Sequence, residues 1–264
     1  MSQNKTPIKA KIILEADSII IEYIKIVQNT CNMFAFITSN LNDIPFDEIP
    51  KPPIISNIKL GDIDYVGDKK NYLDMWLFNH GMNDIIKAIN ISLGLANYLA
   101  EITSLNKTNI KYGEYIEFEK RLNKKYLKKD LPALIDLTSK LVNKPLIYVE
   151  EIKSINDVRK CHEHRSGIVT EIDTNSNDGE IPNLKMKWIG NQLSYERNGD
   201  EFIIYKTGVS LDKGDLLKLS NIKKSKSFEI GERIRTDINT FYELAWTGFL
   251  FIKHIADNFN FGKR

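Results

Sequence analysis

The 264 residues include 37 Lys and Arg, 35 Asp and Glu and 42% hydrophobic residues, which leaves a formal net charge of only +2. This composition is typical of a folded globular protein and argues against a disordered chain, and the overall charge does not by itself indicate nucleic acid or a membrane as the partner. Two cysteines, Cys31 and Cys161, are too few for a disulfide framework. We therefore expect reduced thiols in a cytoplasmic protein with no membrane-spanning segment.

Two long helices are predicted in the first part of the chain. Apolar residues recur at three- and four-residue steps over 8–38 and again over 71–104, the pattern of amphipathic helices. Between them, residues 41–67 hold four prolines and no sustained period. This segment is predicted to be an irregular crossover between the two helices.

A more polar helical pattern covers 114–143. Asp130 and Pro132 indicate that a new helix starts within it, because proline is tolerated in a first turn. A shorter helix is predicted from 149 to 164. These elements continue the helical part of the chain up to its central motif.

The period then changes to alternation, which predicts a small antiparallel insertion over 183–208 with a hairpin turn at Asn198-Gly199. Helical spacing returns from Ile230 to Phe259 and predicts a long closing helix. The predicted fold class is thus mainly α, with residues 1–264 forming one helical-bundle domain and the β-hairpin or meander inserted before the last helix.

Common catalytic motifs are absent from the sequence. It has no glycine-rich nucleotide loop, no Gly-x-Ser-x-Gly elbow and no His-Glu-x-x-His pair. Polar chemistry gathers instead in "DVRKCHEHRSG", residues 157–167, which holds two of the four histidines. Zinc is one interpretation of Cys161, His162 and His164, but three ligands so close together on a helix are hard to aim at one ion, and a structural site needs four.

Arg159 offers a second interpretation of the same stretch. On an α-helix it shares a broad face with Val158 and His162, whereas His164 lies well round from it. A guanidinium presents a fork of donors to phosphate oxygens and imidazole exchanges a proton near neutral pH, so the pair suits phosphodiester cleavage without a metal. The structural alternative is a cationic last turn that complements the helix dipole.

These residues resemble the signature of the HEPN superfamily (higher eukaryotes and prokaryotes nucleotide-binding), in which an arginine and a usually polar residue precede a histidine by a few positions. Here the matching elements are Arg159, Lys160 and His164, then "SGIV" at 166–169 and "KGDLLKLS" at 213–220. The match covers the last two-fifths of the chain. The resemblance implies a helical bundle and, in active members, a metal-independent endoribonuclease that works as a dimer with both motifs at one cleft.

The resemblance also implies roles for individual residues. Arg159 would stabilise the pentacoordinate phosphate, and His164 would act as general acid or base for attack by the ribose 2′-hydroxyl, leaving a 2′,3′-cyclic phosphate. His164 of one chain would approach Arg159 of the other. Lys160 departs from the Asn, Asp or His common in the family and either adds a phosphate contact or marks lost activity, and His162 is a competing base.

The expected partners are RNA and a second copy of the chain, with an antitoxin or other protein as a further partner, because family members often serve as toxins or defence effectors. No metal or other cofactor is expected. A basic run and one residue of the motif would track an RNA backbone or else form a solvated surface: Lys120, Arg121, Lys124, Lys125, Lys128, Lys129 and Arg165.

Two other functions stay open. The protein is either catalytic or a module that binds RNA, a nucleotide or a protein without turnover, which Lys160 and the modest charge favour. Alternatively the motif is a dimer contact in which Arg159 pairs with Asp157 or Glu163 across the interface. The aromatic residues of the insertion either stack bases or pack the sheet onto the helices.

Overall fold

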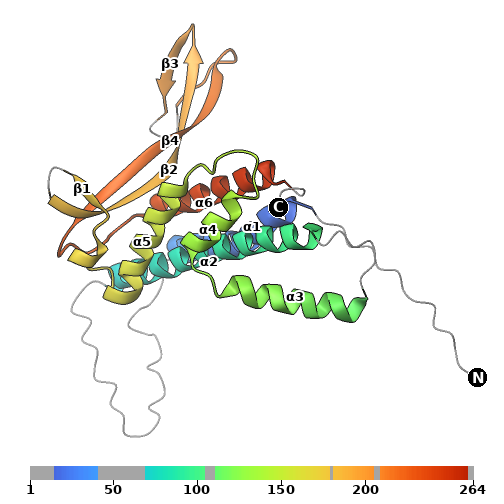
Figure 1. Cartoon of the computed structure of the whole chain (residues 1–264). Helices are drawn as coiled ribbons and strands as arrows, with labels where there is room; N and C mark the ends of the chain where they lie inside the picture. The colour runs from blue at the N-terminus through green and yellow to red at the C-terminus, as the bar shows by residue number, and fades with distance from the viewer. Residues whose placement is uncertain (1–14, 41–68, 105–110, 179–180, 205–208, 261–264) are drawn as a thin grey trace, which may run out of the picture.

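The computed structural model describes residues 15–40, 69–104, 111–178, 181–204 and 209–260. Six helices lie in this part of the chain: α1 (Asp17–Asn40), α2 (Lys69–Ser104), α3 (Tyr112–Leu127), α4 (Leu131–Ser139), α5 (Val149–Arg165) and α6 (Ile238–Asn258) (Figure 1). An antiparallel sheet precedes α6 in the chain. The prediction of a mainly helical fold with a small antiparallel sheet before the last helix is confirmed, whereas the predicted crossover at 41–67 lies outside the described residues.

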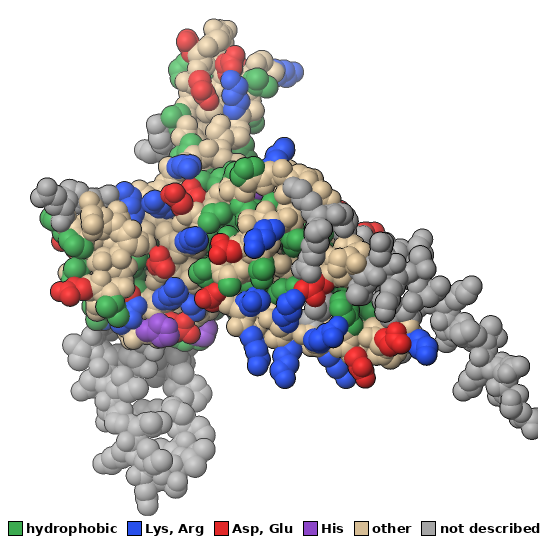
Figure 2. Space-filling model, viewed as in Figure 1, with side chains coloured by type: hydrophobic (Ala, Val, Ile, Leu, Met, Phe, Trp, Pro, Cys, Tyr) green, Lys and Arg blue, Asp and Glu red, His purple; other side chains and the backbone are tan. Residues whose placement is uncertain are grey.

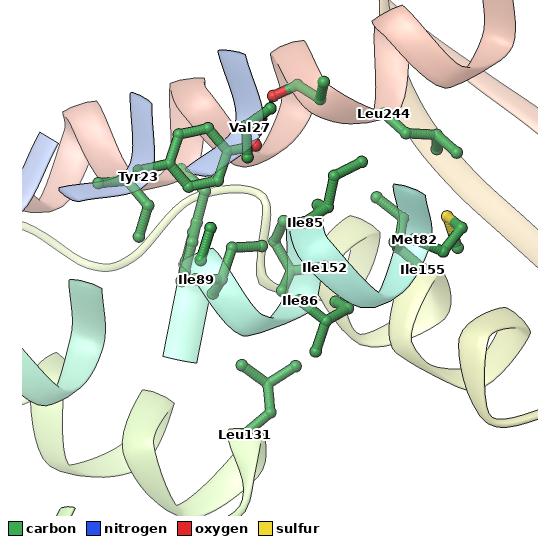
Figure 3. Close-up of a cluster of buried hydrophobic side chains, with 14 of the residues drawn as sticks. Tyr23, Val27, Met82, Ile85, Ile86, Ile89, Leu131, Ile152, Ile155 and Leu244 are labelled. Carbon is green, nitrogen blue, oxygen red and sulfur yellow. Dashed lines mark hydrogen bonds between the residues drawn. The ribbon is translucent and has the colours of Figure 1, made fainter. Parts of the chain in front are cut away.

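The core forms where α2 crosses the other helices. Figure 3 shows Tyr23 and Val27 of α1, Ile85 and Ile89 of α2 and Ile152 of α5 gathered in one cluster. The stretch Met75–Ser104 is long and apolar enough to cross a membrane by length and composition alone. Ile85 and Ile89 are fully buried among the other helices, however, and each such isoleucine contributes roughly 1.5–3 kcal/mol to folding. Core packing accounts for the apolar character of α2.

The polar pattern predicted at 114–143 is divided into two helices. Asp130 caps α4, because its carboxylate accepts a hydrogen bond from the Ala133 amide at 3.0 Å, and proline occupies the first turn. The predicted start of a new helix at Asp130 and Pro132 is therefore confirmed.

The sheet is built around one long strand. β2 (Ile181–Arg197) pairs with β4 (Leu216–Glu229) along one edge and with β1 (Ser176–Asp178) and β3 (Asp200–Ile203) at the two ends of the other edge. Between β1 and β3, this edge of β2 has no neighbouring strand among the described residues, and side chains of α5 and α6 accept hydrogen bonds from its amides. The Lys187 amide donates to Ser154 Oγ of α5 at 2.8 Å, and the Ile189 amide donates to Thr247 Oγ1 of α6 at 2.9 Å.

The sheet extends further than the predicted insertion at 183–208. It begins at β1 and continues in β4, which takes up part of the "KGDLLKLS" segment; residues 205–208 lie outside the described residues. β4 was not predicted, because it buries only Phe228 and therefore lacks a clear alternation of apolar and polar residues. The closing helix was predicted to begin too early. Ile234 is buried in the core from a non-helical segment, and α6 starts after Asp237, whose carboxylate caps the Thr240 amide.

The far ends of β2 and β4, together with β3, project beyond the helices as an arm (Figure 1). On this arm Tyr195 lies opposite both Phe202 and Leu217, and its ring stacks on Phe202 at 5.2 Å. Trp188 lies nearer the body, where it is buried and donates to Glu243 of α6 at 2.6 Å. Trp188 therefore packs the sheet onto the helices, while Tyr195 and Phe202 stack on each other on the arm, where Phe202 is exposed.

Candidate functional site

The predicted motif occupies the last turns of α5 and the turn that follows. Ser166 and Gly167 adopt left-handed backbone angles, with φ of 52° and 74°, and both amides donate to the Cys161 carbonyl. The chain then pairs with the segment before α6: the Val169 amide donates to Glu232, and the Ile234 amide donates to Gly167. The "SGIV" segment thus ends α5 and ties it to the start of α6.

Arg159 is held by two side chains of its own helix. Its Nε donates to Asn156 Oδ1 at 3.1 Å, and its Nη1 lies 2.5 Å from Glu163 Oε2. The Arg159 side chain is 20% exposed, so it lies at the edge of the packed surface rather than inside it. Its acidic partner is in the same chain, and no second copy is needed to pair its charge.

His164 lies near the same carboxylate. Its side chain is 60% exposed, and its Nε2 lies 3.9 Å from Glu163 Oε2. Because both distances run to one oxygen, Arg159 Nη1 and His164 Nε2 are at most 6.4 Å apart, the sum of 2.5 and 3.9 Å. The two side-chain ends are closer within one chain than their angular separation on the helix predicts.

His162 lies in a different environment. It is buried, its ring is tilted against Phe78 with 5.4 Å between ring centroids, and its Nε2 has no hydrogen-bond partner among the described residues. Burial, together with the nearby Arg233, lowers its pKa to about 4. This environment suits a neutral packed imidazole rather than a base that RNA can reach.

Arg165 forms a structural ion pair. Its Nε donates to Asp173 Oδ2 at 2.6 Å and its Nη2 donates to Oδ1, while the Thr170 amide and hydroxyl also donate to Asp173. Asp173 lies in the short 3₁₀ helix η2 (Glu171–Asp173). Burial alone would raise the pKa of Asp173, but these hydrogen bonds lower it below its ordinary value. Arg165 is thereby engaged in fixing the chain after α5 rather than free to bind phosphate.

The three residues considered as zinc ligands point to different surroundings. Cys161 is buried, its Sγ donates to the Ile168 carbonyl at 3.4 Å, and burial raises the pKa of its thiol to about 11. His162 is packed on Phe78, and His164 faces solvent. Within the described ranges, no three His, Cys, Asp or Glu side chains are grouped so that they could hold a metal ion.

The predicted basic run lies on α3 and in the two residues that follow it, Lys128 and Lys129. In Figure 2 Lys and Arg side chains follow α3 along one edge of the molecule, and histidine side chains lie on the same side at the end of α5. Lys125 is paired with Glu101, and the Arg121 guanidinium lies 5.3 Å from the centroid of the Phe118 ring. Lys120, Lys124 and Lys128 are exposed and Lys129 is half-buried.

Lys160, the residue of the motif that departs from the family pattern, faces solvent. Its Nζ lies 3.7 Å from Asp157 Oδ1, and its side chain is exposed. Such a surface pair contributes little to stability and leaves the ammonium free to exchange partners. Lys160 is therefore accessible for the phosphate contact that the sequence allowed.

Comparison of the chain with protein-family models, with curated proteins and with solved structures gave no match. The functional assignment therefore depends on the residues themselves.

Two residues of the site, Asn156 and Asp173, were not predicted. Asn156 has a signal in the sequence, because a spacing of three residues on a helix places it beside Arg159. Asp173 has none, because the turn after α5 brings it to Arg165.

Proposed function

We propose that the protein is a HEPN-like endoribonuclease that acts through Arg159 and His164 without a metal ion. The observation that carries the proposal is the meeting of these two side chains at one carboxylate, Glu163, with 2.5 and 3.9 Å to its Oε2. Charge-assisted hydrogen bonds of about 2.8 Å from the two groups can reach oxygens of a single phosphate across that space. When the ribose 2′-hydroxyl of RNA attacks the neighbouring phosphate, a guanidinium can bind the phosphate oxygens and an exposed imidazole can accept the proton of the hydroxyl.

In the proposed reaction His164 accepts the proton of the 2′-hydroxyl as this oxygen attacks phosphorus. The bond from phosphorus to the 5′-oxygen breaks, the 5′-oxygen takes a proton from water and leaves as a hydroxyl group, and His164 returns its proton to the solvent. Arg159 donates to the non-bridging oxygens and stabilises the charge of the pentacoordinate phosphate. The products are a 2′,3′-cyclic phosphate and a 5′-hydroxyl. The positive charge in this mechanism comes from the guanidinium, so it does not require a metal ion.

The exposed lysines of α3 supply a path for the rest of the RNA, because phosphate contacts need positive charge and no base recognition. We propose a homodimer with one such motif in each chain, as in the family the motif resembles. We also propose that the enzyme works as a toxin or defence effector, which would be controlled by an antitoxin or another protein.

The direct test is cleavage of single-stranded RNA in the presence of a chelator. Wild-type protein should leave cyclic phosphate ends, while Arg159→Ala and His164→Ala should each lower the rate by about 100-fold or more. His80→Ala is the matched control, because His80 is also exposed on a helix, where its ring is tilted against that of Trp76. Undiminished cleavage by His164→Ala would exclude the role given to His164.

Mixing the two inactive variants shows which chains form the site. If Arg159 of one chain works with His164 of the other, a mixture of Arg159→Ala and His164→Ala proteins regains about a quarter of the wild-type rate, since half of the dimers carry one complete site out of two. If both groups act within one chain, as their common contact with Glu163 favours, mixing restores nothing.

The second candidate is a module that binds RNA or a nucleotide without cleaving it. Glu163 favours this function, because its carboxylate occupies Arg159, and so does Lys160 after the arginine. Saturable RNA binding that Arg159→Ala weakens, with intact RNA recovered after long incubation, would support the module and refute the enzyme.

A further inference from the structure

Arg159 is bound on its two sides by groups of different mobility. Asn156 is buried and holds Nε at 3.1 Å, so its amide fixes one side of the guanidinium. Glu163 holds Nη1 at 2.5 Å, and its side chain is 45% exposed. A half-exposed glutamate can rotate into solvent at little cost, because surface ion pairs are weak. Only the Glu163 side of Arg159 is therefore open to exchange.

The Glu163 carboxylate occupies the position that a phosphate would need. Carboxylate and phosphate oxygens accept hydrogen bonds from the same fork of guanidinium donors. Glu163 Oε2 also lies 3.9 Å from His164 Nε2, so the same carboxylate oxygen is close to both residues. A phosphate that bound Arg159 Nη1 beside His164 would therefore compete with this carboxylate for the guanidinium.

We infer that Glu163 is a built-in competitor of the substrate phosphate, which occupies Arg159 in the free protein and leaves it when RNA binds. This inference rests on the proposed function and assigns a regulatory role at the same site to a residue that does not react. Glu163 lowers the affinity for RNA and makes productive binding depend on displacement of its carboxylate.

The first measurement is the affinity for a fluorescent 2′-O-methyl oligoribonucleotide, which lacks the attacking hydroxyl and reports binding alone. Glu163→Gln keeps the side-chain size and removes the charge, and it should tighten binding about two- to five-fold, the range expected for loss of an exposed ion pair. Glu22→Gln is the matched control, because Glu22 forms an exposed pair with Lys25 at 2.6 Å on α1. Its affinity should equal that of the wild type.

A double-mutant cycle separates competition for Arg159 from simple repulsion of RNA by a negative charge. If Glu163 competes for the guanidinium, Arg159→Ala weakens binding about two- to five-fold more in the Glu163→Gln background than in the wild type. If Arg159→Ala lowers the affinity for RNA equally in both backgrounds, Glu163 acts only by repelling RNA with its negative charge, and the inference is overturned. Weaker binding by Glu163→Gln would also overturn it, because the carboxylate would then position Arg159.

The cycle also separates this inference from the proposed function. If Arg159→Ala has no effect on binding in either background, Arg159 does not hold phosphate and both fail together. If Arg159→Ala weakens binding equally in both backgrounds, the phosphate site stands and only the role of Glu163 is refuted. Urea unfolding of each variant verifies that the proteins compared are folded.

Discussion

The turn after α5 requires a glycine, and we expect Gly167→Ala to destabilise the protein strongly. Gly167 has a φ of 74°, a left-handed angle that residues with a Cβ rarely adopt. An added Cβ would also lie 2.8 Å from the Cε1 and Nδ1 atoms of His162. The ring cannot easily move aside, because it is buried against Phe78.

Two costs therefore add. The left-handed backbone costs a residue with a Cβ about 1–2 kcal/mol. Overpacking against the fixed ring costs about 1–3 kcal/mol more. The expected loss in free energy of unfolding is thus about 2–5 kcal/mol, a large share of the roughly 5–15 kcal/mol that stabilises a typical domain. Gly231 separates the two costs, because its φ is 87° but an added Cβ would meet nothing within 4 Å.

The assay is equilibrium unfolding in urea followed by circular dichroism, with the stability change taken from the midpoint at constant slope. Gly231→Ala should lose only the backbone cost, about 1–2 kcal/mol. In a His162→Ala background, Gly167→Ala should lose no more than that, because the ring it strikes is gone. Equal midpoint shifts for Gly167→Ala and Gly231→Ala would refute the steric part of this reasoning.

Other changes test the charges around α5 and on α3. Asp173→Asn leaves the half-buried Arg165 unpaired and should lower the free energy of unfolding by about 3 kcal/mol. Because the folded pKa of Asp173 is lowered, its contribution should be present above pH 3.8 and lost in urea midpoints at more acidic pH. The folded pKa of His162 is about 4 against an ordinary 6.5. Stability should therefore fall as pH drops through that interval, by about 3 kcal/mol at most, and His162→Phe should flatten the pH profile of the midpoint. Lys124→Gln with Lys128→Gln should weaken RNA binding and reduce the slope of log affinity against log salt by about 0.7 per lysine; an unchanged slope would place RNA elsewhere.

The long helices could be predicted from the sequence because each buries one continuous face. The predicted ranges 71–104 and 149–164 correspond to α2 (Lys69–Ser104) and α5 (Val149–Arg165). β4 could not be predicted, because a strand with polar side chains on both faces has no periodic signal, and its register is set by pairing with β2. Pairing between distant segments leaves no mark in a local pattern.

The candidate site divides in the same way. Glu163 was considered a partner of Arg159 across a dimer interface, yet the spacing of four residues on one helix already permits the contact that the structure has. Arg165 was predicted to contact an RNA backbone or form a solvated surface, whereas in the structure it pairs with Asp173. The sequence could not indicate this pair, because Asp173 reaches Arg165 only after the turn at Gly167 reverses the chain. A contact within a helix is predictable from spacing, and a contact across a turn depends on the backbone angles of that turn.

The residues of the motif and of the turn that follows it differ in how much the fold depends on them. Gly167, Val169 and the Arg165–Asp173 pair make the contacts that close α5 and join it to α6, so packing explains them fully. Arg159 makes one hydrogen bond to the buried Asn156 and one ion pair with the exposed Glu163, and His164 is exposed beside the same carboxylate. A hydrogen bond contributes about 0.5–1.5 kcal/mol to stability and an exposed ion pair about 0–1 kcal/mol. The free energy of unfolding therefore depends little on these two side chains. Their replacement should therefore leave the protein folded, so that a loss of RNA cleavage or binding in such variants reports on chemistry rather than on unfolding.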